Sequence, residues 1–306
     1  MSYEEKTKKL IVGIDHGFAM MKHTHGEFSN GLTKIPNGAS IVQNTLIYGG
    51  QTYKIGEGRL PMKEDKVSDE DYFILTVAAI CEEMKHFNTH EAFVTIAAGL
   101  PFSRYGVEKD AFQQYLNRSG EIKASLEGEE YVFTIEDVLI YPQCYAAVVK
   151  LLNSMDGETL AVDIGSKTID IVHIVNHVPS ETKSTSVPGG MILVIENIKN
   201  QVFRQTNRQV TDSQILSVLQ EEEIIIPEEC ITIIRNGFTG FAAFMESKIA
   251  ELGFDPKMIQ IVYAGGGARI MRRFSRNNGK NVRILEDIRA NAVGYEYLCK
   301  LSMDRR

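Results

Sequence analysis

Two stretches of this chain share the same order of apolar and polar positions. In each stretch an apolar run ends in an aspartate, a glycine stands two positions later, and a second strand-like run returns. The first stretch spans residues 9–22 and turns after Asp15, and the second spans residues 160–175 and turns after Asp163. Such runs predict a strand, a tight turn and a returning strand at both places. The repetition also predicts that the chain is built from two similar halves.

The turns of these two hairpins are candidate phosphate-binding sites. Glycine lets a backbone turn sharply and lie close to a ligand, and the N–H groups of such a turn can bind an anion. A single strand that ends in Asp-x-Gly is more often an ordinary strand followed by a turn. The interpretation as phosphate-binding sites therefore depends on the pattern occurring twice. Carboxylates at the strand ends suit a hydrated Mg²⁺ ion, which takes few protein ligands. The candidate residues are the metal ligands Asp15 and Asp163 and the phosphate contacts Gly17, Lys22, Gly165, Ser166, Lys167 and Thr168.

Strands and helices are expected to alternate between the two hairpins. Apolar residues recur at helical spacing over residues 73–87, and Asp69 or Asp71 is the expected cap of that helix. The other expected elements are a third strand over 28–35, a hairpin of residues 46–48 and 52–55, a surface loop over 58–71, a buried strand over 92–101, a helix over 106–118, a hairpin over 122–135, and a strand, a break at Pro142 and a helix over 137–152.

Two glycine-rich segments in the second half are further candidate ligand contacts. Gly189 and Gly190 lie between a strand and a helix, where they suit either contact with an anion or base or a flexible helix entry, and both interpretations stay open. Gly265, Gly266 and Gly267 follow a buried strand and precede a helix. Only small residues let such a turn lie flat against a purine ring or a ribose, so this segment indicates a nucleotide.

Helical spacing dominates the rest of the second half. The expected elements are a helix striped over 192–202, a helix capped by Thr211 or Asp212 that ends at Gln220, a solvated acidic run over 221–223, a long helical segment over 227–252 with a bend or break at Gly237 or Gly240, and a closing helix over 284–298 whose Ala290, Ala292 and Gly294 allow close packing.

Composition and charge exclude several classes of protein. A chain of 306 residues can bury the cores of two medium domains. The formal net charge of -7 argues against broad electrostatic binding of DNA by this chain alone. No apolar run approaches the length of a membrane span, and the charged N-terminus lacks the apolar core of a signal peptide. A cytoplasmic location is therefore expected.

Histidine and cysteine spacing does not indicate a metal site. His23 and His25 stand two positions apart on the returning strand, without an evident third ligand, and are expected to be exposed. The four cysteines are scattered and form neither a Cys-x-x-Cys motif nor a disulfide framework, which favours a reducing compartment. They are Cys81, Cys144, Cys230 and Cys299.

The motifs, taken in their order along the chain, resemble those of the actin-like ATPases, and within them the plasmid-segregating ParM/StbA group. The resemblance covers nearly the whole length, and the order and spacing of the set are much more specific than any single motif. Residues 15–22 look like the first phosphate motif, residues 163–170 like the second, residues 264–270 like the adenosine motif and residues 141–143 like the first connecting segment, while residues 98–101 and 290–297 are similar to stretches typical of the ParM-like group.

The resemblance implies an α/β fold of two lobes, each a mixed sheet flanked by helices, with a nucleotide cleft between the lobes. Domain I would comprise residues 1–155 and 286–306, and domain II residues 156–285. Asp15 and Asp163 would hold Mg²⁺ mainly through waters, and Lys22 would reach the β- and γ-phosphate oxygens. Gln143, at the end of the connecting segment, would direct the attacking water at the γ-phosphate.

The chain departs from the family pattern at two places. Phe18 and Ala19 stand where the first phosphate turn usually offers a Ser or Thr hydroxyl, so backbone N–H groups alone are left to hold the phosphate there. Gln143 stands where the best-known ParM has Glu. Because a neutral amide orients water but cannot take its proton, slow hydrolysis that requires the assembled state is expected.

The expected function is that of a filament-forming ATPase that polymerises with nucleotide and segregates plasmid DNA through an adaptor protein. The implied cofactors are ATP, or GTP, and Mg²⁺. The expected partners are further copies of the chain in a head-to-tail filament and a DNA-binding adaptor, with no direct binding of nucleic acid or membrane. The sequence does not indicate which surface residues would form the filament contacts.

Two alternatives within the same fold stay open. A small-molecule kinase usually carries larger insertions and an additional Asp base at the cleft, and no convincing one is present. A chaperone-type ATPase would need a substrate-binding domain, whereas this chain ends at Arg306 directly after the last helix.

Overall fold

The computed structural model describes residues 8–36, 43–61, 66–155 and 157–304. The N-terminal residues 1–7 and part of the predicted surface loop, residues 62–65, lie outside the described residues. The chain divides into two compact units. The first unit comprises residues 1–150 and 289–306, and the second comprises residues 151–288.

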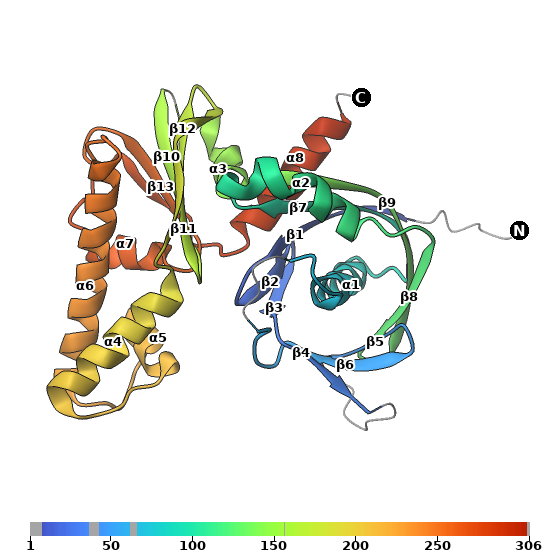
Figure 1. Cartoon of the computed structure of the whole chain (residues 1–306), viewed down its shortest axis with the longest axis horizontal. Coiled ribbons are helices and arrows are strands. Elements are labelled where there is room, and N and C mark those ends of the chain that lie inside the picture. The colour runs from blue at the N-terminus through green and yellow to red at the C-terminus, as the bar shows by residue number, and fades with distance from the viewer. Residues whose placement is uncertain (1–7, 37–42, 62–65, 156, 305–306) are drawn as a thin grey trace, which may run out of the picture. The chain divides into compact units, whose positions relative to one another are not determined.

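A mixed sheet, nine-stranded within the described residues, forms the first unit (Figure 1). Its strands are β1 (Lys8–His16), β2 (Met20–His23), β3 (Gly26–Ser29), β4 (Leu32–Ile35), β5 (Thr45–Tyr48), β6 (Gln51–Ile55), β7 (Glu91–Leu100), β8 (Glu121–Leu126) and β9 (Glu129–Pro142). Their order is β3-β2-β1-β7-β9-β8-β5-β6-β4, and β1, β7 and β9 run parallel. Because parallel strands end at the same edge of a sheet, the residues that follow β1 and β9 share one edge.

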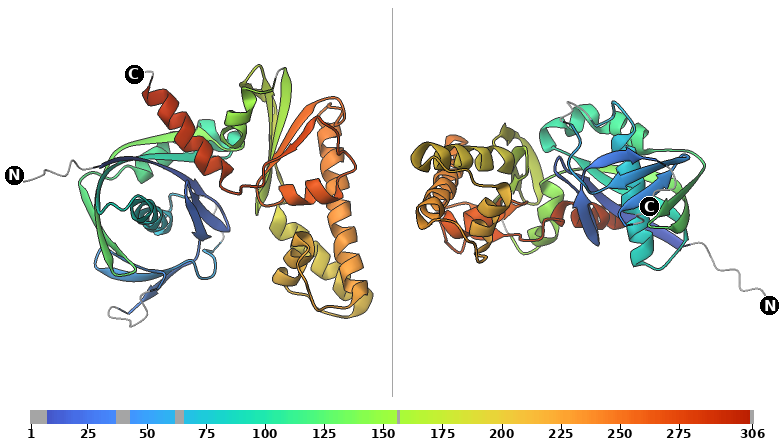
Figure 2. Two further views of the ribbon diagram at one scale, coloured as in Figure 1. Left: turned by 180° about the vertical axis from the view of Figure 1, so that it is seen from behind. Right: turned by 90° about the horizontal axis from the view of Figure 1, so that it is seen from below.

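Helix α1 (Asp71–His86) lies inside the curve of this sheet (Figures 1 and 2). Its buried residues run without a break from Tyr72 to Cys81. The predicted apolar stripe is confirmed, but buried residues also lie on the other faces of the helix. A helix that is covered on all sides is apolar all round. The N-cap position is Glu70, which makes no side-chain cap bond, while Asp69 accepts a hydrogen bond from the N–H of Asp71 at 3.0 Å.

The outer face of β1, β7 and β9 is covered by helix α8 (Ala290–Met303). Small residues allow this contact, as predicted. A Cβ at Gly294 would lie 1.9 Å from the carbonyl oxygen of Ala146, and a Cβ at Gly13 would lie 2.0 Å from that of Ala292. Helix α3 (Tyr145–Leu152) follows β9, and helix α2 (Phe102–Leu116) packs on β7 and β9.

The second unit has a five-stranded sheet in the order β12-β11-β10-β13-β14. Its strands are β10 (Glu158–Ile164), β11 (Thr168–Val175), β12 (Val178–Pro188), β13 (Gln260–Ala264) and β14 (Val282–Ile284), and its helices are α4 (Met191–Thr206), α5 (Asp212–Gln220), α6 (Glu228–Glu251) and α7 (Ala268–Phe274). Strands β10, β13 and β14 run parallel. Helices α4 and α6 pack together beside the sheet (Figure 2).

Several predicted elements are confirmed with changed bounds. The predicted third strand is wrong, because residues 28–35 contain the end of β3 and all of β4, and β4 pairs with β6 at the far edge of the sheet. The hairpin over 122–135 is confirmed as β8 and the start of β9, but its second strand continues without a break through the expected next strand to Pro142. The closing helix begins at Ala290, later than the expected position 284.

Two helices differ from the prediction for local reasons. Helix α2 begins after Pro101, whose fixed φ suits a helix start, and Gly106 therefore lies inside it. Helix α6 passes Gly237 without a break. A Cβ at Gly237 would lie 2.5 Å from Cγ1 of Ile198, so this glycine permits close packing against α4. Thr211 caps α5 with a complete capping box, as predicted.

Among the described residues, none of the helices is long and apolar enough to span a membrane.

Candidate nucleotide-binding site

The first hairpin places a lysine opposite the predicted metal ligand. In the β1–β2 pair, Asp15 lies opposite Lys22, and the Nζ atom of Lys22 is 3.1 Å from Oδ2 of Asp15. The Asp15 residue is 1% exposed. A Cβ at Gly17 would lie 2.5 Å from the carbonyl oxygen of Met20, so the tight turn requires glycine there. The hairpin thus holds a buried carboxylate, a cation and a glycine turn in one place.

Asn30 donates hydrogen bonds to the carbonyl oxygens of this turn, and it was not identified from the sequence. Its Nδ2 atom donates to the carbonyl oxygen of Phe18 at 2.5 Å and to that of Gly17 at 3.4 Å. Its backbone N–H donates to the carbonyl oxygen of Ala19 at 3.1 Å. Asn30 is 1% exposed, so these bonds form away from water.

The second hairpin has the same geometry with a different pair of residues. Asp163 lies opposite Asp170 in the β10–β11 pair, and both residues are buried. The N–H of Gly165 donates to the carbonyl oxygen of Thr168 at 3.0 Å and closes the turn. Like charges directly opposite each other in a sheet are destabilising, and a cation beside them removes that cost. Asp170 stands at the same spacing from Asp163 as Lys22 from Asp15, a signal that could have identified it.

The segment at Gly189 and Gly190 supports the second turn. The N–H of Met191 donates to Gly165 O and that of Ile192 to Ser166 O, both at 2.9 Å. The N–H of Gly190 donates to Lys167 O at 3.1 Å. A Cβ at Gly190 would lie 2.6 Å from Gly165 O, so the close approach requires glycine. In this structure the start of α4 therefore binds the backbone of the second turn.

The three glycines after β13 lie beside the end of β10. The parallel register places Ala264 next to Asp163. Gly265 has φ +79°, and a Cβ there would lie 2.2 Å from Oδ1 of Asp163, so both conformation and space require glycine. A Cβ at Gly267 would lie 2.2 Å from Cγ2 of Ile164. Gly266, in contrast, has open space within 4 Å of the position of a Cβ, which leaves room for a ligand.

Gln143 follows β9 at the same edge of the sheet as Asp15. Strands β1 and β9 are separated by β7, so the two residues lie about 10 Å apart along the hydrogen-bonding direction. The N–H of Gln143 donates to Leu100 O at 2.8 Å, which fixes its backbone. The next residue, Cys144, has φ 68° and donates its N–H to Oδ1 of Asn291 in α8 at 3.0 Å. Asn291 was not identified from the sequence.

A second lysine lies near Asp15. The ammonium of Lys66 is 5.9 Å from the ring centroid of Tyr72 and 5.8 Å from that of Phe112. Burial lowers the pKa of Lys66 to about 8, and the Asp15 carboxylate opposes that shift. His16 packs edge-on against the same two rings, and burial lowers its pKa well below 6.5. His16 is therefore neutral, while Lys22 and Lys66 supply positive charge beside Asp15.

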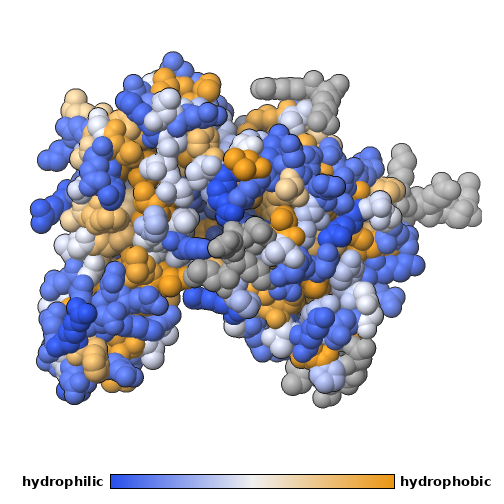
Figure 3. All heavy atoms as spheres, in the orientation of Figure 1, coloured by the Kyte–Doolittle hydropathy of each residue, from blue (hydrophilic) through white to orange (hydrophobic). Residues whose placement is uncertain are grey.

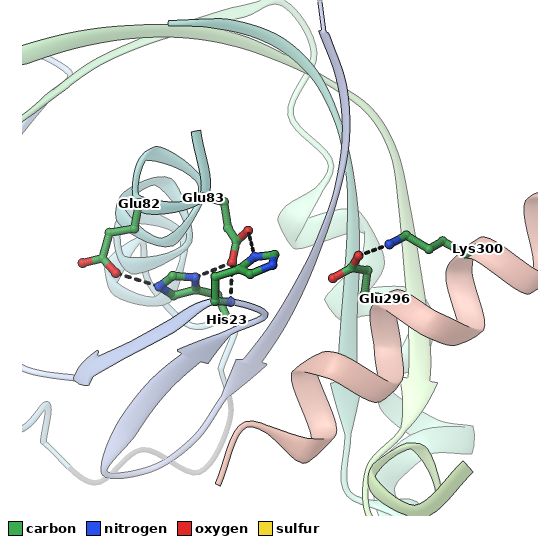
Figure 4. Close-up of polar contacts among 6 residues, drawn as sticks. His23, Glu82, Glu83, Glu296 and Lys300 are labelled. Carbon is green, nitrogen blue, oxygen red and sulfur yellow. Dashed lines mark hydrogen bonds and ion pairs between the residues drawn. The ribbon is translucent and has the colours of Figure 1, made fainter. Parts of the chain in front are cut away.

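His23 is buried, so the prediction that it is exposed is wrong (Figure 4). Its Nδ1 lies 2.6 Å from Oε1 of Glu83 and its Nε2 2.6 Å from Oε2 of Glu82, both on α1. Burial lowers the pKa of His23, but its bonds to the two glutamates raise it to about 9. Strand β2 ends at His23, and His25 then follows in a turn and donates its N–H to Glu83 at 2.8 Å. No three His, Cys, Asp or Glu residues in the described ranges form a metal-binding group.

Figure 4 also shows a contact on helix α8, on the other side of the sheet from α1. Glu296 and Lys300, one turn apart on α8, form an ion pair (Figure 4). This pair stabilises the helix, as such spacing does on helix surfaces, and does not contact the hairpin residues drawn beside His23.

Each unit thus brings its own predicted residues together. The edge of the first sheet holds Asp15, Gly17, Lys22 and Gln143. The edge of the second sheet gathers the remaining candidates, which are Asp163, Gly165, Ser166, Lys167, Thr168, Gly189, Gly190, Gly265, Gly266 and Gly267.

The chain is similar to actin-like proteins in sequence and structure. Residues 13–145 match the model of the N-terminal domain of actin-like proteins. An archaeal actin homolog of Thermoplasma volcanium is 25% identical over 285 residues, which cover 85% of this chain and 84% of that protein. The crystal structure of an archaeal actin homolog in complex with ADP has a TM-score of 0.73 and 20% identity, covering 95% of this chain and 99% of that one.

A second solved structure is of a filament. The 15-stranded ParM filament from Clostridium botulinum has a TM-score of 0.70 and 17% identity to this chain, covering 96% of this chain and 100% of that one. The resemblance to actin-like proteins that the motifs predicted is therefore confirmed, and the chain has the actin-like fold.

Proposed function

We propose that this chain is a filament-forming actin-like ATPase whose two glycine turns bind the phosphates of Mg-ATP or Mg-GTP. The observation that carries the proposal is the matched pair of hairpins, each with a buried aspartate at its strand end and a glycine turn after it. Residues 1–155 and 286–306 then act as domain I of the actin-like fold, and residues 156–285 as domain II.

The residues suit the cofactors that the proposal requires. Asp163 and Asp170 are buried carboxylates in register, a donor set that favours a divalent cation. Asp15 and Asp163 would hold Mg²⁺ through waters, and the bound ion would neutralise phosphate charge. Lys22 would pair with phosphate oxygens, and the hydroxyl groups of Ser166 and Thr168 lie on the second turn.

The base and the attacking water have their own candidate residues. Gly265, Gly266 and Gly267 form a flat turn that would contact adenosine, with open space at Gly266. Gln143 would hold a water by donating and accepting hydrogen bonds with its amide. Because the amide cannot remove the proton from that water, hydrolysis is expected to be slow in the monomer and faster in the assembled state.

Self-association is the second part of the proposal. A solved structure of similar fold is a ParM filament. Among the described residues, Val107, Ile225 and Met258 are almost fully exposed, at 87%, 101% and 83%. Figure 3 shows apolar residues among polar ones on the face in view. Head-to-tail contacts between copies of one chain generate open filaments. Segregation of plasmid DNA through an adaptor protein, in the cytoplasm, is the role we propose for the filament.

Sedimentation and light scattering with different nucleotides test this proposal. Purified protein is mixed with ATP, GTP, ADP or a non-hydrolysable analogue, each with Mg²⁺ or with EDTA. We expect polymer with a triphosphate and Mg²⁺, and persistent polymer with the analogue. Polymer that forms equally without nucleotide, or a melting temperature that no Mg-nucleotide raises at millimolar concentration, would contradict the proposal.

A further inference from the structure

The two phosphate turns are fixed by the same pattern of hydrogen bonds to their backbone carbonyl oxygens, although the donors differ. In each turn the carbonyl oxygens of three consecutive residues, beginning with the glycine, accept hydrogen bonds from the protein interior. They belong to residues 17–19 in the first turn and to residues 165–167 in the second. In the second turn the donors are backbone N–H groups at the start of α4. In the first turn all three carbonyls accept hydrogen bonds from Asn30.

Binding the carbonyls fixes the direction of the neighbouring N–H groups. A peptide unit is planar and trans, so the C=O of one residue and the N–H of the next point in opposite directions. When Gly17 O and Phe18 O face Asn30, the N–H groups of Phe18 and Ala19 face the opposite side of the turn. Successive N–H groups that converge in this way form an anion-binding concavity.

From this symmetry we infer that Asn30 is the positioning residue of the first phosphate turn. It holds the N–H groups of Phe18 and Ala19 toward a nucleotide phosphate, in a turn that has no Ser or Thr hydroxyl at those two positions. The inference rests on the proposed function, because it assigns Asn30 to the nucleotide phosphates. It adds a residue that stands outside the hairpin motif.

The side-chain chemistry explains why this position needs asparagine. A carbonyl oxygen only accepts hydrogen bonds, so the Asn30 atom between Phe18 O and Gly17 O must be the NH₂ group. An aspartate there would place a buried carboxylate oxygen against two carbonyl oxygens, with no proton between them. A serine would offer one donor in place of two. Asparagine supplies two donors from one atom without burying a charge.

The test compares two isosteric substitutions of asparagine by aspartate. Asn30→Asp removes the donors to the first turn. Asn281→Asp is the matched control, because Nδ2 of Asn281 also donates to two carbonyl oxygens, those of Pro256 at 2.8 Å and Ile259 at 2.7 Å. Both variants are expected to be less stable in urea. ADP affinity is then measured by calorimetry at a temperature where each variant is folded.

We expect Asn30→Asp to weaken ADP binding roughly tenfold or more, and Asn281→Asp to leave it unchanged. Equal ADP affinity of wild type and Asn30→Asp, or an equal loss in both variants, would overturn the inference. Wild-type protein that binds no ADP would instead contradict the proposed function. Asn30→Ser, with one donor, should bind ADP with intermediate affinity.

A measurement on the wild-type chain keeps the inference testable if Asn30→Asp does not fold. Amide hydrogen exchange is followed with and without ADP. Slower exchange at Phe18 and Ala19 with ADP is expected, since their N–H groups would bind phosphate. Exchange at these two amides that ADP does not change would overturn the role of Asn30.

Discussion

Lys22 and Asp15 face each other across the first hairpin, with Nζ 3.1 Å from Oδ2. The side chain of Asp15 is 2% exposed and that of Lys22 17%, so the pair is largely shielded from water. Removing one partner of a buried pair leaves the other charge uncompensated, which costs more than the pair itself contributes. The same lysine would also meet phosphate oxygens, so its loss should affect both folding and binding.

We predict that Lys22→Ala lowers the free energy of unfolding by about 3 kcal/mol and weakens nucleotide binding. Urea unfolding and ADP calorimetry measure the two effects. Lys9→Ala is the control, because Lys9 makes an exposed pair with Glu136 on the same sheet and should cost at most about 1 kcal/mol. An equal, small loss in both variants would show that Lys22 does not compensate Asp15.

The pH dependence of stability should identify the charge on His23. The pKa of His23 is raised from 6.5 to about 9, because Glu82 and Glu83 outweigh the effect of burial. A raised folded-state pKa stabilises the protein fully below 6.5, and this stabilisation is lost as the pH rises through about 9. The upper limit of the effect is about 3 kcal/mol, since one pKa unit corresponds to about 1.4 kcal/mol.

His23→Gln should remove this dependence. Urea unfolding at pH 6 and pH 9.5 is expected to show a fall in wild-type stability that is much smaller in the variant. His90→Gln is the control, since the Nδ1 atom of His90 contacts a backbone carbonyl oxygen, that of Glu130 at 3.0 Å, in place of a carboxylate. An equal change in stability over this range in wild type and His23→Gln would mean that His23 is neutral.

Features that depend on one short stretch of sequence were predictable, and contacts between distant elements were not. Both hairpins and the cap at Thr211 were predictable, because each depends on residues within one short stretch. The partners Asn30, Asn291 and Glu83 were not, because each reaches its site from another element. Strand β4 was misassigned for the same reason, since its neighbour is decided by how the sheet curves around α1.

Asp163→Ala should abolish Mg-dependent nucleotide hydrolysis. The carboxylate stands at the end of β10, beside the glycine turn and Gly265. Without it the metal loses its proposed anchor, so nucleotide affinity and turnover should both fall. Phosphate release by purified protein measures the effect, with Asp212→Ala, an exposed aspartate at the start of α5, as the control. Hydrolysis at the wild-type rate would remove Asp163 from the site.

Gln143→Ala should assemble but not disassemble. The residue follows β9 at the edge that also carries Asp15, and its backbone is fixed by Leu100 and by the bond from Cys144 to Asn291. Its amide would hold the attacking water without contacting the nucleotide, so binding should survive the substitution. If the triphosphate form favours polymer and the diphosphate form monomer, blocked hydrolysis traps the polymer, because a ligand shifts an equilibrium only by its differential affinity.

Light scattering and phosphate release, followed together after limiting ATP is added, measure this prediction for Gln143. The expected trace rises and stays high, with little phosphate released. Gln113→Ala is the control. The side chain of Gln113, on α2, donates to the carbonyl oxygen of Val138 in β9 at 2.6 Å, so its loss should affect stability alone. The alternative is that Gln143 only supports the start of α3, in which case its loss costs roughly 1 kcal/mol of stability and leaves turnover intact. Scattering that decays on the wild-type time course, with normal phosphate release, would establish that alternative.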